Sequence, residues 1–90
     1  MATVLRIIGL STGEPTEFDG MLVAAYDPTW WRPDGSYDGG ILEVTDKPDR
    51  AMVFPDAVTA IEKWREAYGV RLDGKPNRPL TAFTVSVENL

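Results

Sequence analysis

No cysteine and no histidine occurs among the 90 residues of this chain. Without cysteine the fold has no disulfide and no thiolate metal cluster, so burial of apolar side chains must offset the entropy of ordering the chain. The length predicts one domain, 1–90, and 43% hydrophobic residues are enough for a small core. Histidine and cysteine are also the side chains most used in catalysis and metal binding. We therefore expect a non-enzymatic domain with no cofactor and no bound metal.

The charge and the hydropathy of the chain argue against two classes of partner, nucleic acids and membranes. Nine basic residues face 14 acidic ones, a formal net charge of −5, and the stretch 27–56 carries seven acids against three bases. Binding to a phosphate backbone needs clustered positive charge, so the sequence disfavours nucleic acid as a partner. Since no apolar run has the length of a signal peptide or a membrane span, we expect a cytoplasmic protein without membrane contact.

The best-marked element is an amphipathic helix over about residues 55–68. Pro55 suits a first helical turn, Asp56 suits the positive end of the helix dipole, and Gly69 is placed to end the helix. Apolar residues recur with helical spacing to form one stripe: Ala57, Ile61, Trp64 and Tyr68. We expect this stripe, with Trp64 in the core, to pack on a sheet.

Five other segments have the composition of β-strands, namely 3–8, 21–26, 41–45, 51–54 and 81–87. Glycine and proline in 11–20 predict a long hairpin loop between the first two, and the sequence Asp-Lys-Pro-Asp at 46–49 predicts a turn between the next two. The last segment alternates apolar and small polar side chains, as a half-buried strand does. The predicted fold class is α+β, a four- to five-stranded, mostly antiparallel sheet with one helix on one face.

Aromatic side chains are concentrated in 26–37, where prolines and glycine forbid a long regular element. The adjacent Trp30 and Trp31 cannot both face one side of a strand, so at least one is exposed. Trp and Arg dominate interface hot spots, and we expect Trp30, Trp31, Arg32 and Tyr37 to contact a partner. Two alternatives stay open. One tryptophan closes the end of the sheet with Arg32 stacked on the other, or the rings stack on a sugar or a base.

A second loop, 71–80, is locally basic. Its Asp-Gly pair marks a tight turn, and its prolines hold the chain extended. Arg71, Lys75 and Arg78 predict an electrostatic contact with an acidic partner, or with the acidic middle segment of a second copy of the chain. The simpler alternative is that Arg78 pairs with an acid of its own chain.

Residues 34–41 match the first eight positions of a calcium-binding loop only in part. Asp34, Ser36 and Asp38 would supply oxygen ligands, but Thr45 stands where the motif needs a bidentate Glu. The pattern favours a Gly- and Asp-rich turn. A weak calcium site on Asp34, Ser36 and Asp38 is the alternative.

The second half of the chain holds a more specific pattern. It consists of the run DGKPNRPLTAFTV at 73–85 and of seven earlier residues, Thr45, Asp46, Pro48, Ala51, Phe54, Ala57 and Trp64. These residues resemble a family of short proteins from bacteria and their phages that has no established activity. The resemblance implies a phage or prophage accessory protein, a class in which small acidic domains often bind a host protein.

The sequence thus predicts a small acidic domain that binds another protein or itself. A homodimer is expected through the sheet face that the helix leaves bare, since apolar residues near Ile7 and Val23 indicate cover on both faces. The alternative function is binding of a small ligand or calcium through the loop 34–39.

Overall fold

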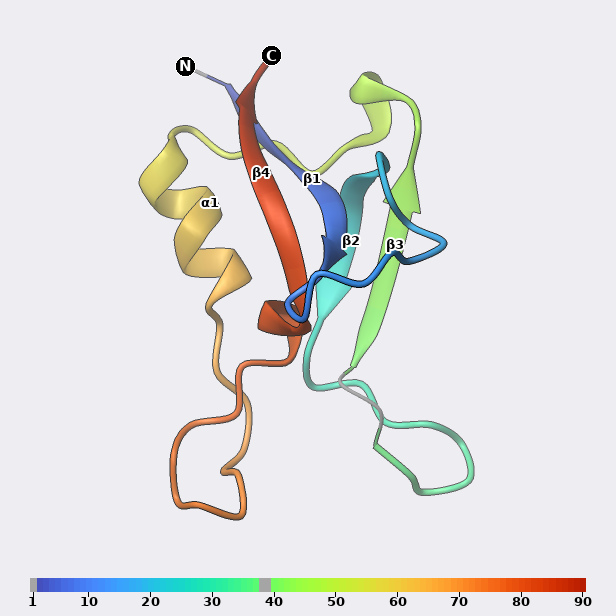
Figure 1. Cartoon of the computed structure of the whole chain (residues 1–90), viewed down its shortest axis with the longest axis vertical. Helices are drawn as coiled ribbons and strands as arrows, with labels where there is room; N and C mark the ends of the chain where they lie inside the picture. Colours follow the sequence, from blue (N-terminus) through green and yellow to red (C-terminus); the bar gives the residue numbers. More distant parts are fainter. Residues whose placement is uncertain (1, 38–39) are drawn as a thin grey trace.

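The computed structural model describes residues 2–37 and 40–90, which form a four-stranded antiparallel sheet and one helix (Figure 1). The strands are β1 (Thr3–Leu10), β2 (Leu22–Asp27), β3 (Ile41–Thr45) and β4 (Phe83–Asn89), in the spatial order β3-β2-β1-β4. The helix is α1 (Ala57–Trp64), and short 3-10 turns span Pro48–Arg50 and Pro79–Ala82. The predicted α+β class is confirmed, and the strand count is four.

The core lies between the sheet and the elements that cover one of its faces. Leu5 and Ile7 of β1 and Val23 of β2 have no exposed surface, and Ala60 of α1 and Leu80 of the second 3-10 turn belong to the same buried cluster. Full burial of a large aliphatic side chain stabilises a fold by about 1.5–3 kcal/mol. This cluster therefore holds α1 and the second 3-10 turn against one face of the sheet.

The helix begins at Ala57, two residues later than predicted, so Pro55 precedes it, and it buries a different stripe. Asp56 caps its first turn, because the carboxylate accepts a hydrogen bond from the backbone N–H three residues on, at 2.8 Å. Ala60 is fully buried and Trp64 is half-buried, whereas Ile61 is 40% exposed and Ala57 is exposed as well. The predicted stripe was wrong at these two positions, since the helix is rotated to pack Ala60 on β1 and β4.

The helix is also shorter than predicted. It ends at Trp64, and the Arg78 guanidinium donates a hydrogen bond to the carbonyl oxygen of Arg65 just beyond it. Tyr68 therefore lies outside the helix, and Gly69 does not end it. Within the described parts of the chain, no helix combines the length and the apolar character needed to cross a bilayer.

The predicted strand 51–54 is not part of the sheet. The Met52 N–H donates to the Val23 carbonyl oxygen at 2.9 Å, and Phe54 forms an isolated antiparallel bridge with Thr3, with N···O distances of 2.9 and 2.8 Å. The prediction of a hairpin with β3 was wrong because these backbone groups bind β1 and β2 instead. The segment carries the chain from the end of β3 to α1 (Figure 1).

An ion pair lies on the face of the sheet opposite the core. Arg6 of β1 and Glu88 of β4 approach to 2.9 Å, with side chains 37% and 35% exposed. The hydrogen bond from Arg6 lowers the pKa of the Glu88 carboxyl. This face is therefore polar at the pair and apolar at Ile8, which is 53% exposed. A symmetric dimer through this face stays a prediction.

Candidate binding site

Two loops lie at the end of the sheet where β2 finishes and β3 begins (Figure 1). The aromatic loop, residues 28–37, follows β2 and contains both adjacent tryptophans. The basic ribbon, residues 68–78, follows α1 and carries Arg71, Lys75 and Arg78. A side-chain hydrogen bond joins them, since the Trp31 indole N–H donates to the Tyr68 hydroxyl at 3.0 Å.

The basic ribbon is held by its own backbone. The Tyr68 N–H donates to the Asn77 carbonyl oxygen at 2.8 Å, and the Arg71 N–H donates to the Lys75 carbonyl oxygen at 2.8 Å. The turn between the two arms is closed by the Gly74 N–H, which donates to the Arg71 carbonyl oxygen at 3.0 Å. The predicted tight turn is present, and it places Arg71 and Lys75 on adjacent arms of one ribbon.

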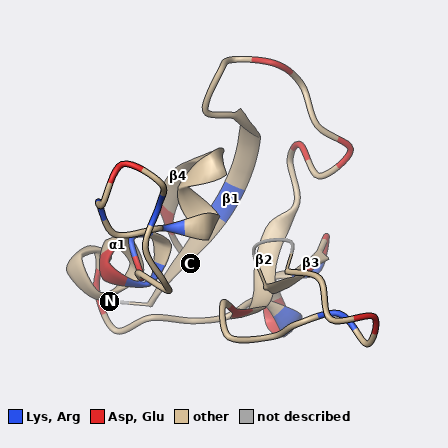
Figure 2. Cartoon of the chain, turned by 90° about the horizontal axis from the view of Figure 1, so that it is seen from below, with Lys and Arg blue, Asp and Glu red and all other residues tan. Residues whose placement is uncertain are grey.

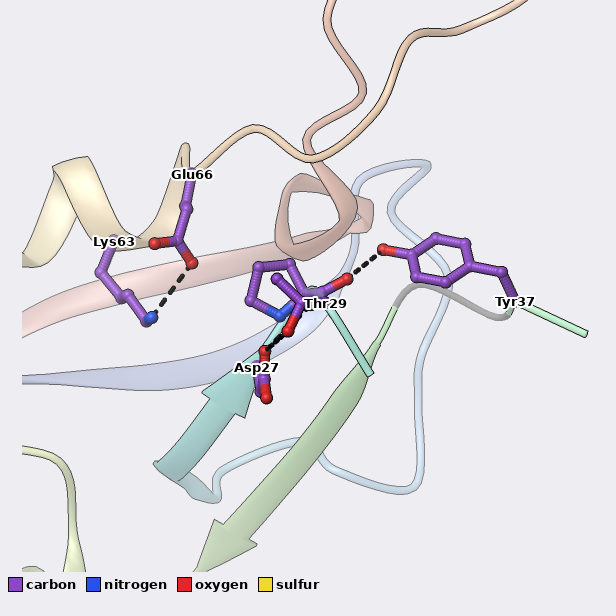
Figure 3. A network of polar contacts seen from close by, with 6 residues as sticks. Asp27, Thr29, Tyr37, Lys63 and Glu66 are labelled. Carbon is purple, nitrogen blue, oxygen red and sulfur yellow. Dashed lines mark hydrogen bonds and ion pairs between the residues drawn. The ribbon is translucent and has the colours of Figure 1, made fainter. Parts of the chain in front are cut away.

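The aromatic loop is held by short-range polar contacts (Figure 3). The Asp27 carboxylate accepts hydrogen bonds from the Thr29 N–H at 2.9 Å and the Thr29 hydroxyl at 2.6 Å. These bonds lower the pKa of Asp27 and turn the chain out of β2. Further along, the Tyr37 hydroxyl donates to the Pro28 carbonyl oxygen at 2.7 Å, which ties the end of the loop to its start.

Three aromatic rings form the aromatic cluster, which consists of Trp31, Tyr37 and Tyr68. Tyr37 is the middle ring, with centroid distances of 4.9 Å to Trp31 and 5.4 Å to Tyr68. Both pairs are tilted, an arrangement that aromatic side chains favour. Burial, followed by the charges of Tyr68 and Asp27, raises the pKa of Tyr37. Since Trp31 is 50% exposed, the cluster offers a rigid apolar surface to a partner.

A basic cavity of about 710 Å³ opens beside this cluster. Tyr37 lines it from the aromatic loop, and Arg71, Lys75 and Arg78 line it from the basic ribbon and its end. The described lining residues include no Asp or Glu. Four of the seven residues predicted to contact a partner thus share one cavity, although the sequence places them in two separate loops.

The three cations differ in the ion pairs and hydrogen bonds that they make within the described chain. Arg71 approaches Asp73 at 3.7 Å, with side chains 60% and 47% exposed, so this contact contributes little to stability. Arg78 binds the Arg65 carbonyl oxygen, and it pairs with no acid among the described residues, although the simpler alternative assumed that it would. The Lys75 ammonium has no ion-pair partner among the residues that the structure describes. Figure 2 is viewed from the end of the sheet where the two loops lie, and it shows basic positions along the loop beside α1.

The remaining predicted contact residues lie elsewhere on the aromatic loop. Trp30 is 39% exposed and does not line the basic cavity. Arg32 lines a different cavity, of about 630 Å³, together with Phe18 and Tyr26. Tyr68 was missed as a site residue because its spacing placed it in the helical stripe. No local signal in the sequence marks it as a partner of Trp31.

The structure describes only part of the predicted alternative calcium loop. The Asp34 carboxylate accepts hydrogen bonds from the Ser36 N–H at 2.8 Å and the Ser36 hydroxyl at 2.6 Å, and these bonds lower its pKa. Asp38 lies outside the described residues. Among residues 2–37 and 40–90, no group of three or more His, Cys, Asp or Glu side chains is placed to hold a metal ion.

Comparison of this chain with protein-family models, with curated proteins and with solved structures finds no significant match. The residue roles of the site therefore rest on its own geometry and charge.

Proposed function

We propose that this domain is a binding module whose basic cavity and aromatic cluster receive an acidic segment of a partner protein. The observation that carries the proposal is the shared cavity, into which Tyr37, Arg71, Lys75 and Arg78 converge from two separate loops. Lys75, whose ammonium has no ion-pair partner within 2–37 and 40–90, lies in a chain whose net charge is −5. Acids more than about 8 Å from the cavity weaken its attraction for a carboxylate little, because their charges are largely screened at physiological salt.

The chemistry of the lining supports carboxylates as the groups recognised. Arg71 and Arg78 present planar guanidinium groups, which match the geometry of a carboxylate, and Lys75 adds a point charge. The aromatic cluster beside the cavity supplies rigid area for apolar side chains of the same segment. The acidic remainder of the chain disfavours a long polyphosphate such as nucleic acid.

The proposal concerns binding and not catalysis. The described lining of the cavity offers three cations, one tyrosine and neutral polar groups, without a carboxylate or imidazole to act as a general base. A host protein as the partner accords with the resemblance of the second half of the chain to bacterial and phage proteins.

Fluorescence anisotropy with a labelled hexaglutamate peptide tests the proposal, with hexalysine as the charge-reversed probe. We expect the wild type to bind hexaglutamate, with an affinity that falls as salt is raised, and not to bind hexalysine at this site. Arg71→Glu/Lys75→Glu should weaken hexaglutamate binding at least about tenfold, which corresponds to about 1.4 kcal/mol.

The matched control is Lys47→Glu/Arg50→Glu, which makes the same change in charge around the 3-10 turn Pro48–Arg50. That turn lies at the other end of the sheet (Figure 1). Circular dichroism establishes that both variants are folded. Equal weakening in both double variants would show that only net charge matters, and that result or the absence of hexaglutamate binding to the wild type would refute the proposal.

A further inference from the structure

β4 is an edge strand with one side unpaired. It lies at the end of the order β3-β2-β1-β4, and in the part of the chain that the structure describes it pairs with β1 alone (Figure 1). The Leu90 N–H donates to the Ala2 carbonyl oxygen at 2.9 Å, toward β1, while the Phe83 carbonyl oxygen accepts from the Trp64 indole N–H at 3.1 Å. Backbone groups alternate in direction along an antiparallel strand. The N–H and C=O groups of Val85 and Val87 therefore point away from β1.

An apolar groove of about 400 Å³ runs along this free edge. α1 contributes Ile61 and Trp64 to it, and β4 contributes Val85 and Val87. Ile61 is 40% exposed and Val87 is 36% exposed, so apolar surface remains open to a partner. None of the described residues that line the groove is charged, although 26% of the chain is charged. The uncharged lining of the groove therefore favours an uncharged segment, and the outward backbone groups of β4 favour one that is extended.

We propose that β4 of a second copy of this chain occupies the edge, so that two sheets join in an antiparallel dimer. The seven residues of β4 include no proline and no lysine, the residues that commonly protect a free edge from such pairing. Their one charge is Glu88, which is already paired with Arg6 of its own chain. The strand thus carries no unpaired charge against a second copy of itself.

The register follows from the two-fold symmetry. Val85 lies opposite Val87 of the second copy, Ser86 lies on the axis, and Glu88 lies opposite Thr84. The outward N–H and C=O groups of both valines are then satisfied, and no two acids face each other. The other edge strand, β3, is shorter at five residues and carries Glu43, so it is less suited to self-pairing.

Sedimentation and amide hydrogen exchange test this dimer without reference to the basic cavity. In a concentration series up to about 1 mM, the sedimenting mass should rise from 10.0 kDa toward twice that value. The Val85 and Val87 amides should exchange at least about tenfold more slowly at the highest concentration. Amides of the basic ribbon should not change. A mass that stays monomeric, or protection elsewhere than on β4, would overturn the proposal.

Val87→Lys should abolish the dimer, because it places a charge in the groove and at the edge. Val70→Lys is the matched control, since Val70 is 73% exposed and lies in the basic ribbon, away from the groove. Ser86→Glu is a second variant that keeps the core intact and places two like charges opposite each other on the axis. A dimer that survives both Val87→Lys and Ser86→Glu with unchanged exchange at Val85 would refute this edge as the interface. Loss of hexaglutamate binding would leave this result unaffected.

Discussion

The phenol hydroxyl of Tyr26 is buried in the core, and the described residues do not supply the hydrogen bond that usually offsets the burial of a polar group. The residue is 7% exposed, and its hydroxyl makes no hydrogen bond of normal geometry with the described residues. Burial, with smaller effects from Tyr37 and Glu66, raises its pKa far above the usual range. The folded chain therefore keeps a proton that the unfolded chain releases above about pH 10. Stability contributed by the neutral phenol is complete below that pH and is lost as pH rises toward the raised value.

We expect Tyr26→Phe to change the free energy of unfolding by less than about 1 kcal/mol at neutral pH, because the change breaks no hydrogen bond of normal geometry among the described residues. The variant should also lose less stability than the wild type above about pH 10. Tyr37→Phe is the matched comparison, since it removes the hydrogen bond to Pro28 and should cost about 0.5–1.5 kcal/mol. Urea titrations at several pH values measure both. A larger cost for Tyr26→Phe than for Tyr37→Phe would contradict this description of the core.

Gly40 marks a close approach between the start of β3 and the start of the aromatic loop. A Cβ at this position would lie 2.6 Å from the Pro28 Cα and still closer to the Asp27 carbonyl oxygen, and φ is +87°. Gly35 has the same φ but no atom within 4 Å of its Cβ position. Gly35→Ala should therefore cost only the backbone strain, about 1–2 kcal/mol. Gly40→Ala should cost at least about 2 kcal/mol more, by urea unfolding. Equal costs would mean that the two segments are not in contact.

Single residues also show what a sequence can reveal of a site. Charge and residue type identified Arg71, Lys75 and Arg78 as basic contacts, and the structure places all three on one cavity. Composition could not show that Tyr37 lies beside them, because that contact depends on the path of the chain between distant loops. Tyr68 was assigned to a helix whose end depends on a long-range contact.

At the scale of elements, β1 contains two adjacent isoleucines that differ sharply in burial. Ile7 has no exposed surface, whereas Ile8, at the bulge, is 53% exposed. Ile7→Ala should cost about 2–5 kcal/mol of stability, because it leaves a cavity in the core. Ile8→Ala should cost less than about 1 kcal/mol. Thermal and urea unfolding of this isoleucine pair test the assigned faces, and a reversed order of costs would show that β1 is placed in the wrong register.

Element types were predicted well where the signal is local, although the bounds were shifted: α1 begins at Ala57 and not at 55, and β4 spans Phe83–Asn89 and not 81–87. The cap at Asp56 and the alternation that becomes β4 are local, and both are present in the structure. The end of α1 is not local, because the guanidinium of Arg78 binds just beyond the helix. The segment 51–54 has the composition of a strand, but its hydrogen-bond partners are on β1 and β2, which no local pattern encodes.

At the scale of the whole molecule, the distribution of charge matters more than its sum. The net charge is −5, yet the described lining of the basic cavity is free of acids. Long-range repulsion is screened at physiological salt, so a short acidic segment responds mainly to the local cations. The groove along β4 lies beside α1 and its described lining is uncharged, so the two proposed surfaces differ in chemistry and in location.

The most direct test of the binding proposal is a titration of isotope-labelled protein with unlabelled hexaglutamate, followed by amide chemical shifts. The largest shifts should fall on the residues that line the basic cavity, Tyr37, Arg71, Lys75, Asn77 and Arg78. The amide chemical shifts of Lys47 and Arg50, which are cations at the other end of the sheet, should not change. Shifts centred on Lys47 and Arg50, or spread evenly over all basic residues, would contradict the account.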